Sequence, residues 1–251
     1  MQLAALGRAF SVKTLGLFAE LFDVSSETGW CSSLFEVGES MGFEQTLFAL
    51  VPLPGQRLED AFLRSSYSDQ WRHKYDTTPM HHVDPTVAHC VTRNTPLIWS
   101  PDIFTSKPQK EMYEEACSYG IRSGVTLPIH GPRGELGIMC FVNDARPGKK
   151  FRQELVHHLP QLSLLRDFAF ESSLQFAAPN EEPGQIPSLT PRELECLRWA
   201  AAGKTSWEIA KILICSEAVI NFHIRNVRRK MDVTTRREAV VKAIRLGLIH
   251  P

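Results

Sequence analysis

The segment from Ser216 to Met231 carries side chains of the types that read DNA bases. Arg225 and Asn221 end in planar groups that match guanine and adenine, respectively, in the major groove. Together with Glu217 and Arg228 they recur at i, i+4, i+8 and i+11, which places all four on one face of a helix. The pattern predicts a base-reading stripe; the alternative is an ordinary solvated face.

The same helix has an apolar stripe that predicts a packed core. Its members recur at i, i+4, i+7 and i+11 and are Ile220, Ile224, Val227 and Met231. Basic side chains gather toward the helix end and the start of the next helix, where phosphates are easier to reach than bases. These predicted phosphate contacts are Arg229, Lys230, Arg236 and Arg237.

Charge is unevenly distributed along the chain. The 251 residues have a formal net charge of zero, but residues 188–251 hold 12 Lys and Arg against six Asp and Glu. A basic module is therefore joined to an acidic one, and the basic module is the candidate binder of a polyanion.

Asp84 is the candidate for binding chemistry in the acidic part. It stands directly before Pro85 at the head of an apolar helix, where a buried carboxylate needs a partner. N-capping is one possible role, because Asp caps helices well and Pro suits the first turn. Contact with a polar group of a ligand is the other.

The cysteines and histidines predict neither disulfides nor a metal site. None of the six cysteines forms a C-x-x-C pair, which suits reduced thiols in a cytosolic protein. The pairs His81-His82 and His157-His158 do not combine with the cysteines at metal-ligand spacing. The catalytic patterns G-x-S-x-G and H-E-x-x-H do not occur either. We therefore expect no enzyme and no cofactor.

The elements that position these residues fall into two predicted domains. Residues 177–188 contain three prolines and a glycine without periodicity, which predicts a linker between residues 1–176 and residues 189–251. The chain shows no signal peptide and no apolar run near the ~20 residues that span a bilayer. We expect a soluble cytoplasmic protein without a membrane partner.

The C-terminal domain is predicted to be all-α, with four helices. Capping-box patterns precede three of its apolar periodic runs, at Thr190–Glu193, Thr205–Glu208 and Thr235–Glu238. The short helix that begins at Thr205, a tight connection at residues 214–216 and a longer basic helix form the helix-turn-helix layout.

The first domain mixes helices and strands. Two apolar runs, Val125–His130 and Leu136–Asn143, flank Gly131-Pro132-Arg133-Gly134 and predict a hairpin. A further strand is expected at Thr46–Pro52, and helices at Ser11–Phe22, Thr28–Met41, Gln70–Tyr75, Asp84–Arg93, Lys110–Tyr119 and Phe151–Phe176. This order predicts an α/β sandwich of the GAF/PAS type, an antiparallel sheet with helices on both faces.

The segment that runs from Leu189 to Val233, beginning LTPRELECLRW, closely resembles the LuxR-type DNA-binding domain, with Glu193, Leu197 and Gly203 at that family's landmarks. The first domain resembles the family's autoinducer-binding domain through its motif residues Trp71, Tyr75, Asp84-Pro85, Pro96, Trp99, Gly120 and Gly124. The stretches DPTVAHC, GPRGELG and GKTSWEI look like the LasR branch, which answers to long-chain 3-oxo-acyl-homoserine lactones.

The resemblance implies a quorum-sensing transcription regulator whose signal ligand is an N-acyl-homoserine lactone. Trp71 would donate to the lactone carbonyl, Asp84 would accept from the amide N–H, and the Tyr67 hydroxyl would bind the amide carbonyl. The full set of implied ligand contacts is Tyr67, Trp71, Arg72, Tyr75, Asp84, Thr86, Trp99, Phe104, Thr126 and Cys140. An apolar tunnel for the acyl chain would be lined by Leu47, Ala49, Ala61, Val87, Leu136 and Ile138.

Two residues depart from the LasR pattern. Cys140 replaces a Ser that hydrogen-bonds the amide carbonyl, and a thiol is a weak donor. Phe104 replaces a pocket Tyr. Both changes make the pocket more apolar, so the alternative is a regulator of the same fold that answers to no lactone.

The family resemblance also implies partners. Lactone would stabilise a homodimer, and two recognition helices would meet half-sites of dyad-symmetric double-stranded DNA about one helical turn apart. RNA polymerase would be a further partner if the regulator is an activator.

Overall fold

The computed structural model describes residues 12–52, 56–177 and 187–249. The chain divides into two compact units between residues 178 and 179, apart from three residues of a turn at 132–134. Most of the predicted linker lies outside the described residues, as do Ser11, the first residue of the first predicted helix, and the last two residues. The predicted domain boundaries therefore stay predictions.

The first unit is built on one antiparallel sheet of five strands in the order β2-β1-β5-β4-β3. The strands are β1 (Gln45–Val51), β2 (Phe62–Ser65), β3 (Leu97–Ile98), β4 (Ser123–His130) and β5 (Leu136–Asn143). The predicted hairpin is confirmed as β4 and β5. The sequence analysis missed β2 and β3, because strands of four and two residues are too short to show alternation.

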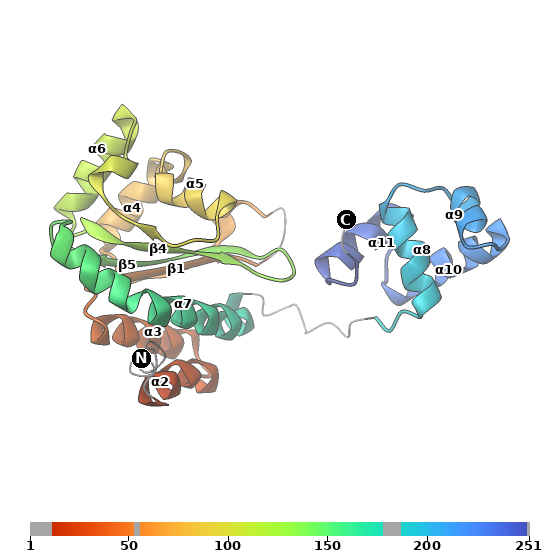
Figure 1. Cartoon of the computed structure of the whole chain (residues 1–251), viewed down its shortest axis with the longest axis horizontal. Helices are drawn as coiled ribbons and strands as arrows, with labels where there is room; N and C mark the ends of the chain where they lie inside the picture. The colour runs from red at the N-terminus through yellow and green to blue at the C-terminus, as the bar shows by residue number, and fades with distance from the viewer. Residues whose placement is uncertain (1–11, 53–55, 178–186, 250–251) are drawn as a thin grey trace, which may run out of the picture. The chain divides into compact units, whose positions relative to one another are not determined.

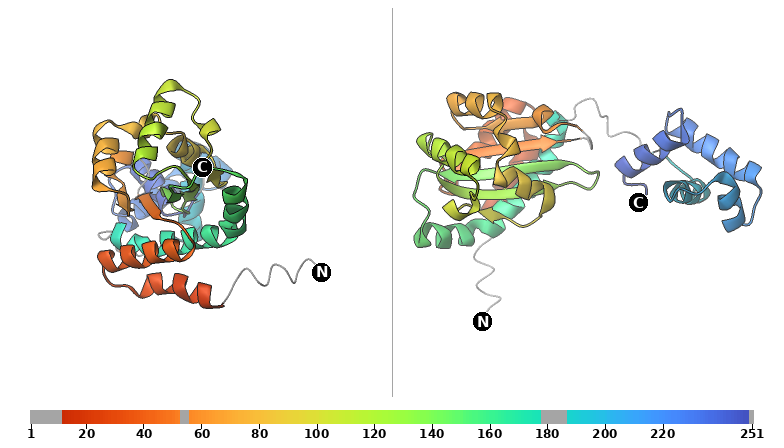
Figure 2. Two further views of the ribbon diagram at one scale, coloured as in Figure 1. Left: turned by 90° about the vertical axis from the view of Figure 1, so that its left-hand side faces the viewer. Right: turned by 90° about the horizontal axis from the view of Figure 1, so that it is seen from above.

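Helices cover both faces of this sheet, which confirms the predicted sandwich (Figure 1). The lower face in that view holds α2 (Val12–Asp23), α3 (Glu27–Ser40) and α7 (Lys149–Ala177), and the left-hand view in Figure 2 shows α2 next to α3. The upper face holds α4 (Asp69–Thr77), α5 (Pro85–Thr92) and α6 (Lys107–Ser118). Three single-turn 3₁₀ helices join these elements: η1 (Leu58–Asp60), η2 (Met80–His82) and η3 (Pro101–Ile103).

The lower face of the sheet is packed solid. Because side chains alternate along a strand, Phe48, Leu127 and Phe141 point toward α3 and α7, where none of them is exposed. Trp30 of α3 lies among them and donates from Nε1 to Ser172 Oγ of α7 at 2.8 Å. This buried hydrogen bond gives the Trp30 indole N–H a partner within the packed layer.

The second unit consists of α8 (Pro191–Ala201), α9 (Ser206–Ile212), α10 (Glu217–Lys230) and α11 (Arg236–Arg245). All three predicted capping boxes are confirmed. In each one the N-cap Thr side chain accepts from the backbone N–H of the Glu, and the Glu side chain accepts from the backbone N–H of the Thr. Ser216 caps α10, and the predicted apolar stripe of that helix is buried. The four-helix helix-turn-helix prediction is confirmed.

Candidate functional site

A cavity of about 500 Å³ lies on the upper face of the sheet, between the strands and α4, α5 and α6. Its floor comes from β1 and β5, whose outward residues Leu47, Ala49, Ile138 and Cys140 contribute to the lining. Helices on the other face fill their side of the sheet with large side chains, whereas here the same strands border open space. A volume of ~300–1,000 Å³ is typical of small-molecule sites.

Two polar groups of the cavity wall have no partner among the described residues. Trp71 of α4 is only 3% exposed, yet its indole Nε1 donates to no group of the described residues. Tyr67 is 9% exposed and its hydroxyl likewise makes no hydrogen bond within the described parts of the chain. Burial raises the pKa of Tyr67 well above its ordinary value of 10.0, so the hydroxyl is neutral and can donate.

Asp84 stands next to them with both carboxylate oxygens engaged. Its Oδ1 accepts from the backbone N–H and the hydroxyl of Thr86, at 2.8 and 2.7 Å, which makes it the N-cap of α5. Its Oδ2 accepts from the Tyr75 hydroxyl at 2.9 Å. Burial raises the pKa of Asp84, and the hydrogen bonds from Thr86 and Tyr75 oppose that rise. The capping role is therefore real, and it coexists with a place on the cavity wall.

Thr126 is the one implied ligand contact that does not line the cavity. Its hydroxyl accepts from Trp99 Nε1 at 2.8 Å and lies 3.3 Å from Cys140 Sγ. It is fully buried behind these two side chains, which both reach the wall. Burial raises the pKa of Cys140 to about 12, so the thiol stays neutral. Thr126 thus orients Trp99, and its contact with a ligand stays a prediction.

The other implied contacts, Tyr75, Thr86, Arg72 and Phe104, line the cavity. Arg72 pairs with Asp76 of its own helix at 2.5 Å. Phe104 stacks on Tyr113 of α6, with ring centroids 4.4 Å apart. Both side chains line the cavity, so their stacked rings form part of its wall.

All six predicted tail-contact residues also line the cavity, but the sequence analysis missed a whole wall. Met112, Tyr113 and Ala116 of α6, with Ile121 after it, complete the apolar lining. The i, i+4 spacing of Met112 and Ala116 marks a buried helix face, although it does not reveal what that face borders. Three polar residues, Glu59, Asp76 and His81, were missed as well.

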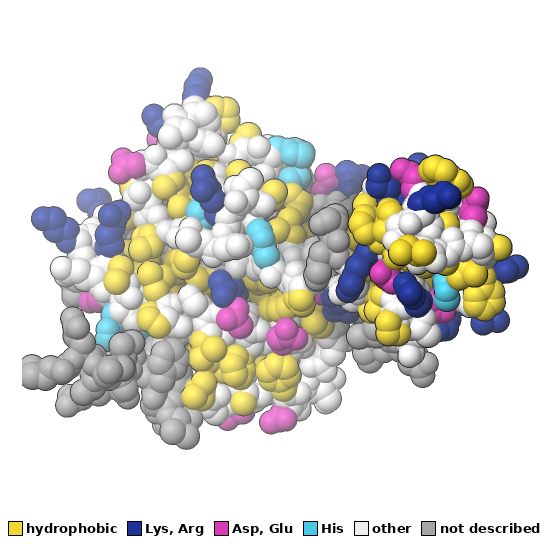
Figure 3. All heavy atoms as spheres, turned by 45° about the vertical axis from the view of Figure 1, so that its right-hand side comes forward, with side chains coloured by type: hydrophobic (Ala, Val, Ile, Leu, Met, Phe, Trp, Pro, Cys, Tyr) yellow, Lys and Arg dark blue, Asp and Glu magenta, His cyan; other side chains and the backbone are white. Residues whose placement is uncertain are grey.

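The second candidate site is the exposed face of α10 in the other unit. Glu217, Asn221 and Arg225 are exposed, while Arg228 is half-buried with its Nε unpaired among the described residues. Arg229 is exposed beside them, and Figure 3 shows Lys and Arg side chains on this unit. The predicted stripe is therefore available to a partner. Val219 and Phe222, also exposed on this helix, were not predicted.

Two predicted phosphate contacts, Lys230 and Arg236, also have structural roles, and their contact with phosphate stays a prediction. Lys230 donates to the Ser188 carbonyl at 2.9 Å and to the buried Glu193 carboxylate at 2.7 Å, which ties α10 to the cap of α8. Arg236 donates to Ser206 Oγ and to the Lys204 carbonyl at the start of α9. Periodicity places both side chains near the helix ends but cannot show that neighbouring helices already hold them.

The comparisons with known proteins decide the family. Residues 26–173 match the model "Autoinducer binding domain", and residues 187–243 match "Bacterial regulatory proteins, luxR family". The chain belongs to the LuxR family. As a member with both domains, it is a ligand-responsive quorum-sensing transcription regulator that binds an autoinducer and DNA.

Relatives of the LuxR-family protein support this assignment over most of its length. It is 30% identical to the transcriptional activator protein VanR of Vibrio anguillarum, over 95% of this chain and 98% of the relative. It is 28% identical to the transcriptional activator protein LuxR of Aliivibrio fischeri, over 86% of each. The solved structure "SdiA in complex with octanoyl-rac-glycerol" is 25% identical, covers 95% of this chain and 96% of its own, and aligns with a TM-score of 0.67.

The LuxR family is thus established, while the LasR branch stays a prediction. Both named relatives are transcription regulators rather than enzymes. Within the described residues, no helix is long and apolar enough to cross a membrane.

Proposed function

We propose that this LuxR-family protein is a receptor for an N-acyl-homoserine lactone. The observation that carries the proposal is the unpartnered indole N–H of Trp71 in a largely apolar cavity. Trp71 lines the cavity, so an occupant of the cavity can accept the hydrogen bond of this indole N–H, and such a bond contributes about 0.5–1.5 kcal/mol net. The cavity therefore favours a molecule with a polar head.

The neighbouring groups suit the rest of such a head. The neutral Tyr67 hydroxyl can donate to an amide carbonyl. Asp84 Oδ2 accepts one hydrogen bond from Tyr75, and a carboxylate oxygen has room for about two, so it can also accept from an amide N–H. A lactone carbonyl would then take the Trp71 donor. These three contacts fix the head at one end of the cavity.

The apolar remainder of the cavity suits an acyl chain. Its walls come from β1 and β5 on one side and from Val87 and Met112 on the other. Each CH₂ group moved from water into such a site contributes about 0.8 kcal/mol. A long chain, with the 3-oxo group of the LasR branch as the finer form of the proposal, would supply most of the affinity.

Ligand binding would act on DNA binding through stability and assembly. A ligand that binds only the folded state stabilises that state by mass action. We propose that the liganded protein is a homodimer whose two α10 helices meet half-sites of a dyad-symmetric element about 34 Å apart. Because relatives are named transcriptional activators, we propose activation, with RNA polymerase as a partner. A regulator of bacterial promoters acts in the cytoplasm.

A thermal-shift series tests the receptor proposal. Acyl-homoserine lactones from short to long chains should raise the melting temperature of the first unit, with one preferred length. Homoserine lactone without an acyl chain is the matched control and should have little effect, because it buries no chain. The proposal fails if no lactone raises the melting temperature.

A second candidate is a receptor for an acyl ligand that is not a lactone. Cys140 and Phe104 make the head end of the cavity more apolar than in the LasR pattern, and the similar SdiA structure contains octanoyl-rac-glycerol. Such an ester could still offer a carbonyl to Trp71. A melting-temperature increase with octanoyl glycerol but with no lactone would favour this candidate. For either candidate we propose binding without catalysis, so the ligand recovered from the protein should be intact.

A further inference from the structure

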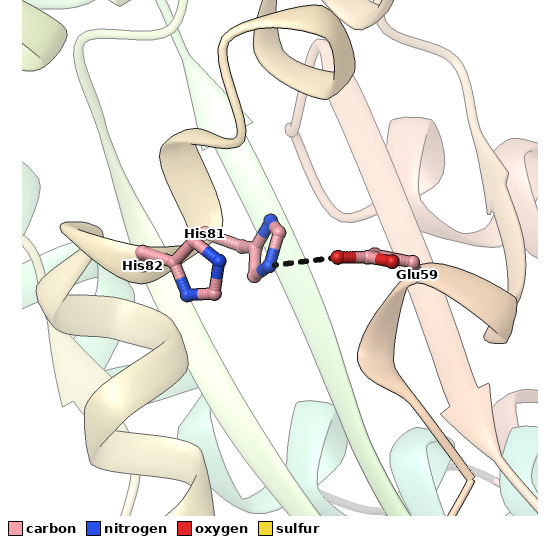
Figure 4. Close-up of side chains that lie close together, drawn as sticks. All are labelled: Glu59, His81 and His82. Carbon is pink, nitrogen blue, oxygen red and sulfur yellow. Dashed lines mark ion pairs between the residues drawn. The ribbon is translucent and has the colours of Figure 1, made fainter.

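Three potential metal ligands meet at the rim of the cavity (Figure 4). Glu59 belongs to η1, and His81 and His82 belong to η2. One ligand atom from each lies within 4.8 Å of the others, and among the described residues no other group of three or more His, Cys, Asp or Glu comes this close. The histidine pair was predicted to have no metal partner among the cysteines. The structure supplies a carboxylate from a different part of the chain.

The donor set has the chemistry of a zinc-type site. Two imidazole nitrogens and one carboxylate oxygen leave room for water, as in zinc sites with three protein ligands. Zinc–nitrogen bonds of about 2.0–2.1 Å place neighbouring tetrahedral donors about 3.3 Å apart. The His81 Nε2 and Glu59 Oε1 atoms are 4.0 Å apart, so small side-chain rotations would bring them to that spacing.

The exposure and the charge of these side chains are also compatible with the binding of a metal ion. The side chains of Glu59 and His81 are 45% and 17% exposed. Arg57 pairs with the other oxygen of Glu59, Oε2, which leaves Oε1 facing His81. The guanidinium of Arg57 partly neutralises the Glu59 carboxylate. It should therefore lower the affinity of the site for a metal ion without preventing binding. We propose that Glu59, His81 and His82 bind a divalent transition-metal ion of the zinc type.

The position of the site gives the ion a consequence for the cavity. Glu59 and His81 both line the cavity, although η1 precedes β2 and η2 precedes α5. An ion would therefore link two separate segments of the rim and slow the exchange of an occupant. This second step rests on the proposed receptor function, whereas metal binding itself does not.

Calorimetry with zinc chloride tests the metal site on the full chain without a polyhistidine tag. Wild-type protein should bind one zinc ion at this site and should not bind magnesium there, since magnesium prefers oxygen ligands. The double variant His81→Ala/His82→Ala and the single variant Glu59→Gln should each weaken zinc binding by at least tenfold. For comparison, the loss of an outer-shell partner already costs about 10–100-fold.

A second histidine pair provides the matched control. His157 and His158 are also adjacent and lie on α7, outside any cluster of three potential ligands among the described residues. The variant His157→Ala/His158→Ala should leave the zinc affinity of the rim site unchanged. The proposal is overturned if wild-type protein binds no zinc, or if both double variants lose the same affinity.

The Arg57→Ala variant sharpens the assignment. Removing the competing guanidinium should tighten zinc binding, because the full charge of Glu59 is then available. Weaker binding in this variant would contradict the role given to Glu59.

The effect on the cavity is read separately, from the dissociation rate of a lactone with and without zinc. Zinc should slow dissociation in wild-type protein but not in His81→Ala/His82→Ala. An unchanged rate with zinc bound would overturn the link across the rim. If no lactone binds, the receptor proposal fails on its own, because calorimetry measures the metal without lactone.

Discussion

The two units of the chain hold their functional side chains in opposite environments. In the second unit, Asn221 and Arg225 are exposed on α10 and are available without any rearrangement. In the first unit, Trp71 and Tyr67 are almost fully buried, and the indole N–H and the phenol hydroxyl have no partner within the described residues. The first unit therefore has hydrogen-bonding groups that a ligand can pair with, whereas the second unit exposes its binding side chains without a ligand. This difference suits a sensor joined to an output.

The largest expected effect compares the two faces of the sheet in the sensing unit. Leu127→Ala removes a fully buried side chain from the packed face and should cost about 2–5 kcal/mol of unfolding free energy. Leu47→Ala on the cavity face should cost less without ligand, because that side chain already borders open space. Urea unfolding of both variants measures the difference. Equal losses would mean that the cavity is filled in solution.

Lys230 and Arg229 test which basic residues of the second unit hold the fold. Lys230→Ala leaves the buried Glu193 without its ion-pair partner and should destabilise this unit by about 1–3 kcal/mol. Arg229→Ala should leave stability unchanged, weaken binding to all DNA sequences and reduce the salt slope by about 1. Thermal unfolding and DNA binding at several salt concentrations measure both. If the variants exchange these effects, the assignment of Lys230 is wrong.

The exposed stripe of α10 should determine which sequence is read. Asn221→Ala and Arg225→Ala should each lose about 1–3 kcal/mol of preference for the operator over random DNA. Their unfolding free energies should stay near wild type, because both side chains are exposed. Fluorescence anisotropy with operator and scrambled duplexes measures the preference. An equal loss on both duplexes would assign these residues to phosphate contact.

The smallest expected effect concerns the charge of Asp84 in the sensing unit. Burial raises its pKa in the folded state, so the folded protein holds this proton more tightly than the unfolded chain does. The stability that this proton contributes is therefore lost as pH rises above 3.8 through the folded-state pKa. Relative to Asp84→Asn, wild-type protein should therefore lose stability as the pH rises from 3.8 toward neutrality. Parallel pH profiles for the two proteins would contradict this.

The second unit could be predicted from sequence almost completely. Capping boxes and helix periodicity are local signals, and they gave the start of each capped helix and the buried stripe of α10. The roles of Lys230 and Arg236 could not be predicted in this way. Both side chains bond to groups more than 25 residues away in sequence, and no local pattern records such contacts.

The sensing site depended on resemblance for most of its residues. Asp84 could be singled out from its place before Pro85, but the space around it results from the packing of α4, α5 and α6 over the sheet. The α6 wall and the meeting of Glu59 with His81 required that packing to be known. Thr126 shows the reverse case, since its alternation on β4 gives the correct face while Trp99 and Cys140 stand between it and the cavity.

The most direct test of the central claim pairs one protein atom with one ligand atom. Affinities of wild-type protein and Trp71→Phe are measured for an acyl-homoserine lactone and for the matched acyl cyclopentyl amide, which lacks the lactone carbonyl. Wild-type protein should prefer the lactone by about 1–3 kcal/mol, and Trp71→Phe should lose that preference. Trp99→Phe is the control, because its indole N–H already donates to Thr126. A preference that persists in Trp71→Phe would contradict the account.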